Sequence, residues 1–324
     1  MTEYNDFIQI GLEPIMTDPI LYMKNIYAQS VRIDRGILDL LIFDNTKQDR
    51  VKAWISDGDG GVVDTLPWTE MPSAELRSYE YYADVKWDGF KYDIFYKDLD
   101  QEGSMENIIA KMNSAQAEFY EAVRSYRIIN ALKNAAHAST DVTASAVWTS
   151  NDAKIALDII NAIQQLRENK VPESSIRQLK IIYPQKAAKW FASAMDIGGT
   201  QQILSDYIMR YIGTNQNPFI PYQPDIRNLG GYGDAEAKYD ALGNDALVVV
   251  PGTAQDPLGT YFNRLTKPTT PIAQVHKLGV QGYSVYSWAG SAVLIRPDIK
   301  LFGSDISGST VYSGKIVKIK NVIS

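Results

Sequence analysis

Few residues in this sequence have the type and spacing that catalysis requires. Its two histidines, His137 and His276, lie at the end of a predicted helix and within a predicted strand, where a histidine commonly caps or packs. The chain has no cysteine, which excludes disulfides, thiolate catalysis, iron–sulfur clusters and cysteine-ligated zinc. It also lacks the HExxH, GxSxG, Walker A and kinase motifs. We therefore expect no catalytic residue, no cofactor and no metal, in a protein that is not an enzyme.

Three aspartates in one glycine-rich segment could bind calcium. Asp57, Asp59 and Asp64 lie in DGDGGVVD, but the segment has neither a ligand at the twelfth loop position nor flanking helices. Its Asp-Gly and Gly-Gly pairs instead favour the positive φ angles of a hairpin turn. The sequence therefore predicts a two-stranded hairpin with its tip at 57–61, in which VKAWIS pairs with GVVDTLPW.

This hairpin carries large apolar side chains, among them Trp54 and Trp68, on a thin ribbon. Because an isolated two-stranded ribbon is barely stable in water, we expect these side chains to pack on the body or on another molecule. The candidate subunit-interface residues are Trp54, Asp57, Gly58, Asp59, Gly60, Gly61 and Trp68.

Aromatic and basic residues concentrate in two other segments. Segment 76–98 alternates apolar and polar residues, which predicts two strands around Asp88-Gly89. Its rings could stack on sugars or bases, although a packing face of a sheet or a subunit interface is the simpler interpretation. Lysines alternate along the last segment, 309–322, which predicts an exposed ribbon with a solvated or edge-protecting face. The net charge of −6 also argues against a protein whose main role is to bind nucleic acid.

The longest predicted element is a helix at 103–137. Apolar residues recur three or four positions apart along it, Ser104 is a suitable N-cap, and no proline or glycine interrupts it. At about 1.5 Å per residue such a helix is roughly 48 Å long, which predicts an extended body. Its apolar stripe is expected to face a sheet made of 76–98 and 280–296, with Lys111 and Arg127 on the opposite, polar face.

The remaining pattern predicts an arm, an α/β subdomain and late strands. Pro14 and Pro19 interrupt the arm, and no run of 18 apolar residues predicts a membrane span. The subdomain elements are helices at 152–169, 185–195 and 201–212 and strands at 178–183 and 246–250. A surface excursion is predicted at 251–271, followed by two strands on either side of an Ala289-Gly290 turn.

In this order of elements, the chain resembles the HK97-type major capsid proteins of tailed viruses. Two passages have the texture of that family, NKVPESSIRQLKIIYPQKAAKW and WAGSAVLIRPDIKLF with its Arg-Pro-Asp run. The resemblance implies an α+β, HK97-like capsid fold. Its expected parts are an N-terminal arm at 1–45, an extended hairpin (E-loop) at 46–75, a P-domain with a spine helix at 76–146, an A-domain at 147–278, and a return to the P-domain with a C-terminal β segment at 279–324.

The resemblance also implies a structural function. Copies of such a protein assemble into pentamers and hexamers of an icosahedral virion capsid around double-stranded DNA, in the host cytoplasm. The implied partners are other copies, a portal protein, optional scaffolding or decoration proteins, and packaged DNA bound without sequence specificity, with no membrane. Two alternatives stay open. One is an encapsulin-type nanocompartment shell, against which the proline-broken arm argues; the other is an α/β enzyme or carbohydrate-binding protein that uses the aromatic strands.

Overall fold

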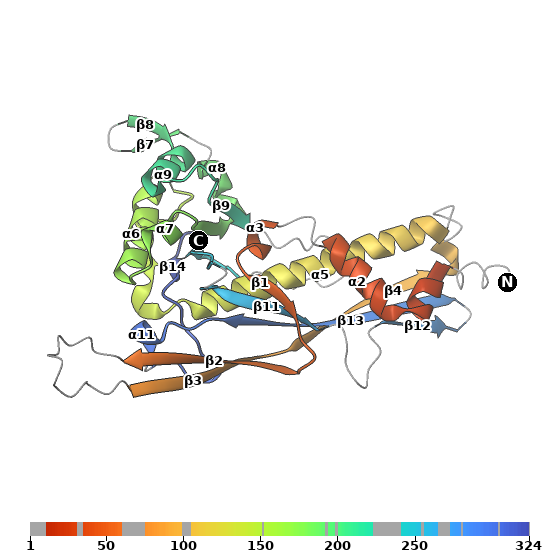
Figure 1. Cartoon of the computed structure of the whole chain (residues 1–324). Helices are drawn as coiled ribbons and strands as arrows, with labels where there is room; N and C mark the ends of the chain where they lie inside the picture. The colour runs from red at the N-terminus through yellow and green to blue at the C-terminus, as the bar shows by residue number, and fades with distance from the viewer. Residues whose placement is uncertain are drawn as a thin grey trace.

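The structure is a computed structural model that describes residues 11–30, 35–59, 75–98, 105–150, 152–191, 194–197, 200–222, 241–253, 256–264, 273–279, 281–303 and 305–323. The molecule is elongated, with a long helix lying along a long sheet and a lobe of helices and strands at one end (Figure 1). Within the described ranges, no helix is both long enough and apolar enough to cross a membrane.

Helix α5 (Met105–Ala135) runs along the axis of the molecule, which confirms the prediction of one long, uninterrupted helix. Glu106 in its first turn and Lys133 in its last turn complement the helix dipole. Its buried face is wider than one stripe because it packs between the long sheet and the N-terminal arm. Lys111 is exposed as expected. The expectation for Arg127 is wrong, because this side chain is largely buried and pairs with Asp88 of the sheet.

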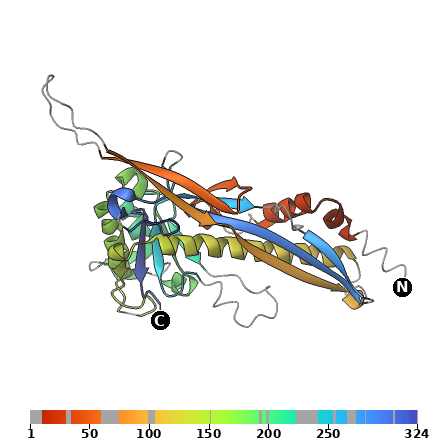
Figure 2. The same ribbon diagram turned by 90° about the horizontal axis from the view of Figure 1, so that it is seen from below.

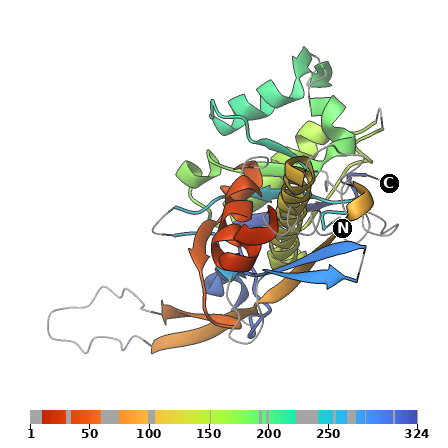
Figure 3. The ribbon, with the colours of Figure 1, turned by 90° about the vertical axis from the view of Figure 1, so that its right-hand side faces the viewer.

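The described part of the arm at 11–30 consists of two short helices separated at Asp18, which confirms the predicted break before Pro19, whereas Pro14 lies within the first helix. Residues 11–17 are helical, and Pro19 is the first residue of helix α2 (Pro19–Ser30), a position where its missing N–H costs nothing. The Asp18 carboxylate accepts a hydrogen bond from the Leu21 N–H at 2.9 Å and caps this helix. Figure 3, which looks along α5, shows α2 beside it. The Tyr22 hydroxyl bonds to Gln116 of α5 at 2.6 Å, so the arm is fastened to the long helix.

The long sheet is built around strand β13 (Gly282–Ile295), which is antiparallel to each of its partners. Its core side faces α5, where Ile94, Val285 and Ala289 pack with the apolar residues of the helix. The other strands are β4 (Lys86–Phe95), β11 (Gly259–Arg264), β12 (Ala273–Leu278) and β1 (Ile42–Asn45), the last of which is parallel to β11. The prediction of a surface excursion at 251–271 is therefore wrong for β11, whose Tyr261 is buried.

Two predicted turns lie inside strands. Asp88-Gly89 is within β4 and Ala289-Gly290 is within β13. Both positions need a glycine because a side chain there would be too close to its neighbours. A Cβ at Gly290 would lie 2.9 Å from Val85 Cγ1, and one at Gly89 would lie 3.1 Å from the Trp288 ring. Neighbouring side chains occupy the room that each glycine leaves. The sequence pattern alone does not separate this packing role from a turn.

The second sheet forms the core of the lobe. Its strands, in spatial order, are β5 (Val142–Thr143), β14 (Ile316–Lys320), β10 (Ala246–Val249), β6 (Lys180–Pro184) and β9 (Phe219–Tyr222). Strand β10 is central, and the predicted strand at 178–183 corresponds to β6. The prediction of an exposed ribbon near the C-terminus is wrong, because β14 is a buried strand between β5 and β10.

The helices of the lobe agree with the sequence in part. Helix α6 (Ile155–Glu168) confirms the helix predicted at 152–169, and it buries Ile155, Ile159, Ile163 and Leu166. The predicted helices at 185–195 and 201–212 are shorter, because Ala194–Ile197 (β7) and Thr200–Ile203 (β8) pair as strands between them. The helical pieces that remain are α7 (Glu173–Ile176), η2 (Gln185–Ala187), α8 (Ala188–Phe191) and α9 (Leu204–Ile212), and short α3 (Arg35–Leu38), η1 (Ala138–Thr140) and α11 (Ile299–Phe302) lie elsewhere.

Gly282 is expected to be intolerant of substitution. A Cβ at this position would lie 1.9 Å from the Ile94 carbonyl oxygen of the paired strand, and its φ of 155° is unfavourable for other residues. We expect Gly282→Ala to lower the free energy of unfolding by roughly 2–4 kcal/mol, measured by urea denaturation. Gly279→Ala is the control, because its φ is also positive but nothing lies within 4 Å of its Cβ. Equal losses in the two variants would contradict this account.

Candidate subunit-contact site

A two-stranded ribbon lies where the hairpin was predicted, with 75–84 as the partner of its first strand; the predicted second strand, GVVDTLPW, lies outside the described residues. Strand β2 (Arg50–Asp59) pairs antiparallel with β3 (Glu75–Asp84), from Arg50 opposite Asp84 to Asp59 opposite Glu75. The predicted partner GVVDTLPW contains Pro67, which lacks the N–H that a ladder requires, whereas β3 is a longer alternating segment. Figure 2 shows the ribbon running toward the lobe end of the molecule.

The candidate tip residues fall into two groups. Asp57, Gly58 and Asp59 are paired with β3, so the prediction of a turn tip at 57–61 is wrong for them. Gly60, Gly61 and Trp68 lie outside the described residues. The pairing continues along the whole of β2 to Asp59. Asp and Gly are tolerated near the end of a ribbon as well as in its turn, so their presence did not mark the turn.

The inner face of the ribbon is attached to the body. Val51 and Tyr81 are buried against Ala292 and Leu294 of the long sheet. The Tyr82 N–H donates to the Gly308 carbonyl at 3.1 Å, and Asp49 pairs with the buried Arg264 at the root of the ribbon. These contacts hold the ribbon at a fixed angle, so the side chains on its other face have defined positions.

The outer face of the ribbon displays Trp54 among paired charges. Alternation along β2 turns Arg50, Lys52 and Trp54 away from the body, and all three are exposed. Trp54 is 67% exposed, the highest value among the large apolar side chains of the described residues. Lys52 and Glu80 form an ion pair at 2.6 Å, as do Arg50 and Asp84. A surface of this composition matches the centre of a protein–protein contact, where tryptophan carries much of the binding energy.

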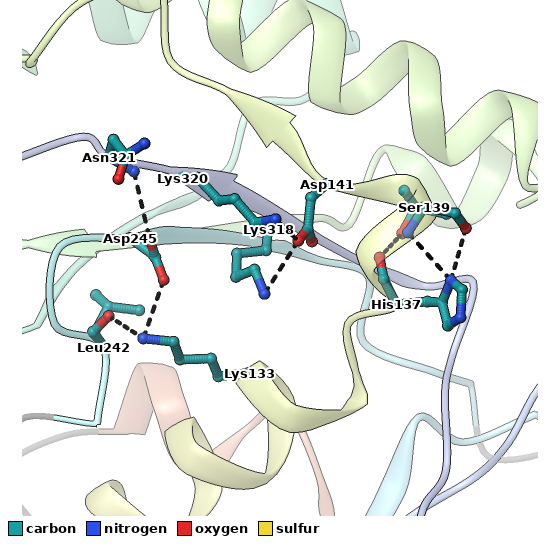
Figure 4. A network of polar contacts seen from close by, with 10 residues as sticks. Lys133, His137, Ser139, Asp141, Leu242, Asp245, Lys318, Lys320 and Asn321 are labelled. Carbon is teal, nitrogen blue, oxygen red and sulfur yellow. Dashed lines mark hydrogen bonds and ion pairs between the residues drawn. The ribbon is translucent and has the colours of Figure 1, made fainter. Parts of the chain in front are cut away.

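A second polar cluster joins α5 to the lobe (Figure 4). The Asp141 carboxylate is 3% exposed and lies 3.2 Å from Lys318 Nζ and 2.7 Å from Lys320 Nζ. Hydrogen bonding to Asp141 raises the pKa of Lys320. At the end of α5, Lys133 pairs with Asp245 at 3.0 Å. The predicted solvated lysine face is therefore wrong for Lys318, whose side chain is mostly buried, whereas the side chain of Lys320 is partly exposed and still pairs with Asp141. Both lysines connect β14 to the segment that follows α5.

The third lysine of this predicted face, Lys315, is also paired. Its Nζ lies 2.6 Å from the Asp256 carboxylate, and its side chain is mostly buried.

The histidines are packed or exposed side chains. His137 Nδ1 accepts a hydrogen bond from the Ser139 N–H at 3.2 Å, so this histidine caps the short helix η1. Its ring also stacks on Phe302. His276 is exposed and meets the Tyr286 ring edge-on. Among the described residues, no group of three or more histidine, aspartate or glutamate side chains is placed to hold a metal ion.

Comparison with solved structures shows what the arrangement resembles. Neither a family model nor a curated protein matches the sequence. The capsid of Myoviridae phage XM1 matches with a TM-score of 0.56 and 12% identity, over 88% of this chain and 90% of that chain. The capsid of an empty GTA particle matches with a TM-score of 0.55 and 10% identity, over 88% and 89%. The capsid of cyanophage P-SCSP1u matches with a TM-score of 0.51 and 13% identity, over 89% and 88%.

The chain has an HK97-like capsid fold. The match extends over nearly all of this chain and of each capsid chain, so the likeness is one of the whole fold and not of a single fragment. The sequence-based division of the HK97-like fold into five segments stays a prediction. The observed pairing adds that the C-terminal strand β14 belongs to the sheet of the lobe.

Sequence reasoning named Trp54 as a candidate contact residue, which is exposed in the structure, and did not name the charged side chains beside it. The register of β2 and β3 places Glu80 opposite Trp54. Glu80 then pairs with Lys52, so both charges lie beside the indole. The sequence does carry one sign of this pairing, because the two alternating segments have opposite charges at positions that can face each other across a ribbon. The aromatic run of 76–98 mainly packs the sheet, since Phe90 and Tyr92 lie against the core around α5.

Proposed function

We propose that this chain is the structural subunit of a closed icosahedral shell, formed by self-assembly of pentamers and hexamers around double-stranded DNA. The observation that carries the proposal is a fold that matches a phage capsid over 88% of the chain and projects a ribbon with a strongly exposed tryptophan. The role is mechanical rather than catalytic, and the shell is the capsid of a virion assembled in the host cytoplasm.

Each element has a role in this proposal. Helix α5 is the spine of a P-domain, the lobe is the A-domain, and the β2–β3 ribbon is the E-loop that lies on a neighbouring subunit. Trp54 is the anchor of that contact. The other interface residues that we propose are Asp57, Gly58, Asp59, Gly60, Gly61 and Trp68.

The energetics of the ribbon support a contact between subunits. A two-stranded ribbon has little stability of its own, and only its inner face is covered by the described part of the chain. Burying an indole removes about 150–250 Å² of mostly apolar surface from water. Because every copy repeats the contact, a modest gain at each site adds up over the shell.

The charge of the chain fits a container for DNA. A net charge of −6 is unsuited to tight binding of phosphates, each of which would add affinity and salt dependence. Packaged DNA is then enclosed without being held by specific contacts. Portal, scaffolding and decoration proteins are the further partners of this proposal.

A nanocompartment shell around a cargo protein is the second candidate. The predicted proline-broken arm argues against this candidate, and the described part of the arm is two short helices separated at Asp18, of which α2 packs on α5. The content of particles purified from the native source separates the two. Nuclease-protected double-stranded DNA supports the virion, whereas a stoichiometric enclosed enzyme without DNA supports the compartment.

Sedimentation velocity of the purified chain tests whether it is a shell subunit. We expect megadalton particles to coexist with free subunits or capsomers. A single species at the 36.2 kDa of the monomer, or a small oligomer under all conditions, would contradict the proposal. That result would favour the remaining alternative, an α/β enzyme or carbohydrate-binding protein.

A further inference from the structure

Strand β13 has an open edge where β4 leaves the long sheet. The two strands pair as far as Ser291 opposite Lys86. The Val85 N–H then donates to the Asp49 carbonyl at 2.9 Å, at the root of the ribbon. Figure 1 shows β3 diverging from β13 toward the lobe end. Over 292–295 β13 still pairs with β11 on one side, but no strand of the described ranges pairs with it on the side that β4 has left.

Two residues of this edge direct their backbone groups away from β11. The Arg296 N–H donates to the Leu258 carbonyl at 2.9 Å, so the backbone of Arg296 points toward β11. In an antiparallel strand both backbone groups of a residue point to the same side, and successive residues alternate. The backbone groups of Val293 and Ile295 therefore point to the side that β4 has left. Each offers an N–H donor and a carbonyl acceptor to an added strand.

A groove of about 490 Å³ runs along this edge, between β13, α5, the last residues of β3 and the segment 309–311. We call it the edge groove and define it by Lys86, Asn130, Asn134, Val293 and Ile295, which all line it. Its volume is in the range of sites that bind ligands in proteins. The edge groove therefore has room for a short length of extended chain beside the free backbone groups.

Two asparagines of α5 line another wall of the edge groove. Asn130 and Asn134 are four residues apart, so their side chains lie on the same face of the helix. Asn130 is half-buried and Asn134 is exposed, and neither amide has a hydrogen-bond partner in the part of the chain that the structure describes. A side-chain amide offers one acceptor and a donor group, which match the N–H and the carbonyl of a peptide.

One positive charge of the edge groove is not balanced by its own chain. The other charges that line the groove are paired, Arg127 with Asp88 and Asp84 with Arg50. Lys86 is exposed and has no ion-pair partner among the residues described. Charge complementarity therefore favours a ligand with an acidic side chain at this end of the groove.

We propose that the edge groove binds an extended, acidic segment of a different protein, which adds to β13 as an antiparallel strand. Its backbone pairs with that of Val293 and Ile295. Its other side bonds to the amides of Asn130 and Asn134. Antiparallel addition continues the line of β4, so the C-terminal residue of the bound stretch meets Lys86 and is the acidic one. The inference goes beyond the proposed function, because a single chain builds the whole groove.

Binding of synthetic peptides to purified subunits tests this inference. The probes are fluorescently labelled peptide amides of about five residues, enough to span the edge at ~3.4 Å per residue. Their last residue is glutamate, and the preceding positions combine valine, isoleucine, threonine and tyrosine. We expect members of this set to raise the fluorescence anisotropy on binding. Exchanging glutamate for lysine should weaken binding about threefold. N-methylation of the backbone nitrogens that face β13 should abolish it, because the added strand then lacks its donors.

Variants of the edge groove locate the binding. The double variant Asn130→Ala with Asn134→Ala should bind the peptides roughly tenfold more weakly, since each amide loses its hydrogen bond to the peptide backbone. Asn161→Ala, at an exposed asparagine of α6, is the matched control and should bind as the wild type does. Lys86→Glu should reverse the charge preference, so that peptides ending in lysine bind more tightly than those ending in glutamate.

Three results would overturn the inference. The first is that no peptide of the set binds up to millimolar concentration. The second is that N-methylated peptides bind as tightly as the unmodified ones, which would exclude strand addition. The third is binding to free subunits that is lost in assembled particles, because another copy would then cover the groove. A chain that binds the peptides but forms no particle would overturn the proposed function alone.

Discussion

Replacing Trp54 with alanine is expected to yield a folded, soluble subunit that no longer closes shells. The side chain is 67% exposed in the single chain, so its removal should change the free energy of unfolding by less than about 0.5 kcal/mol. Truncating a buried tryptophan at the centre of an interface costs about 2 kcal/mol or more, roughly a 30-fold loss in the association constant of each contact. Because a shell repeats the contact in every subunit, this loss should abolish particles at concentrations where the wild type assembles.

The fraction of protein in particles, measured by sedimentation, checks this expectation, and thermal unfolding checks that the variant is folded. Trp54→Phe is the matched control, because it keeps an aromatic ring and should retain part of the yield. Closed particles from Trp54→Ala at the wild-type yield would show that the ribbon face does not carry the assembly contact.

Removing the Asp158 carboxylate is expected to cause a large loss of stability in the lobe. The side chain is 1% exposed. It accepts hydrogen bonds from the Ser145 N–H at 2.9 Å, the Ser145 hydroxyl at 3.2 Å and the Trp148 Nε1–H at 2.9 Å. Asp158→Ala leaves buried donors without an acceptor around a fully buried indole, so we expect a loss of roughly 3–5 kcal/mol in the free energy of unfolding.

Urea denaturation gives this loss directly. Asp158→Asn serves as the control, because its amide oxygen can still accept from one or two of the donors and should recover part of the stability. If alanine and asparagine cost the same and less than about 1 kcal/mol, the carboxylate does not organise this part of the lobe.

Features that depend on regular local pattern could be predicted from the sequence. The length of α5 follows from helical periodicity that no glycine or proline interrupts, and α6 follows from its isoleucine and leucine spacing. The order of such elements along the chain is enough to indicate the capsid fold. Trp54 was identified because a large apolar side chain on a thin ribbon needs a partner.

Features that depend on contacts between distant residues could not be predicted. Lys318 and Lys320 suggested an exposed strand, yet their charges are balanced by Asp141, whose place beside β14 is not visible in the sequence. Gly89 and Gly290 suggested turns, whereas close neighbouring side chains explain them, Trp288 at Gly89 and Val85 with Trp87 at Gly290. The register of the β2–β3 ribbon could not be predicted for the same reason, because it depends on pairing between distant residues.

Electron microscopy of the assembled particles shows whether copies of this chain build a closed shell. We expect closed, symmetric shells in which averaged images resolve rings of five and six subunits, with each ribbon lying across a neighbouring chain. Monomers or small, open oligomers under the conditions that assemble related capsids, or shells whose ribbons touch only their own subunit, would contradict it.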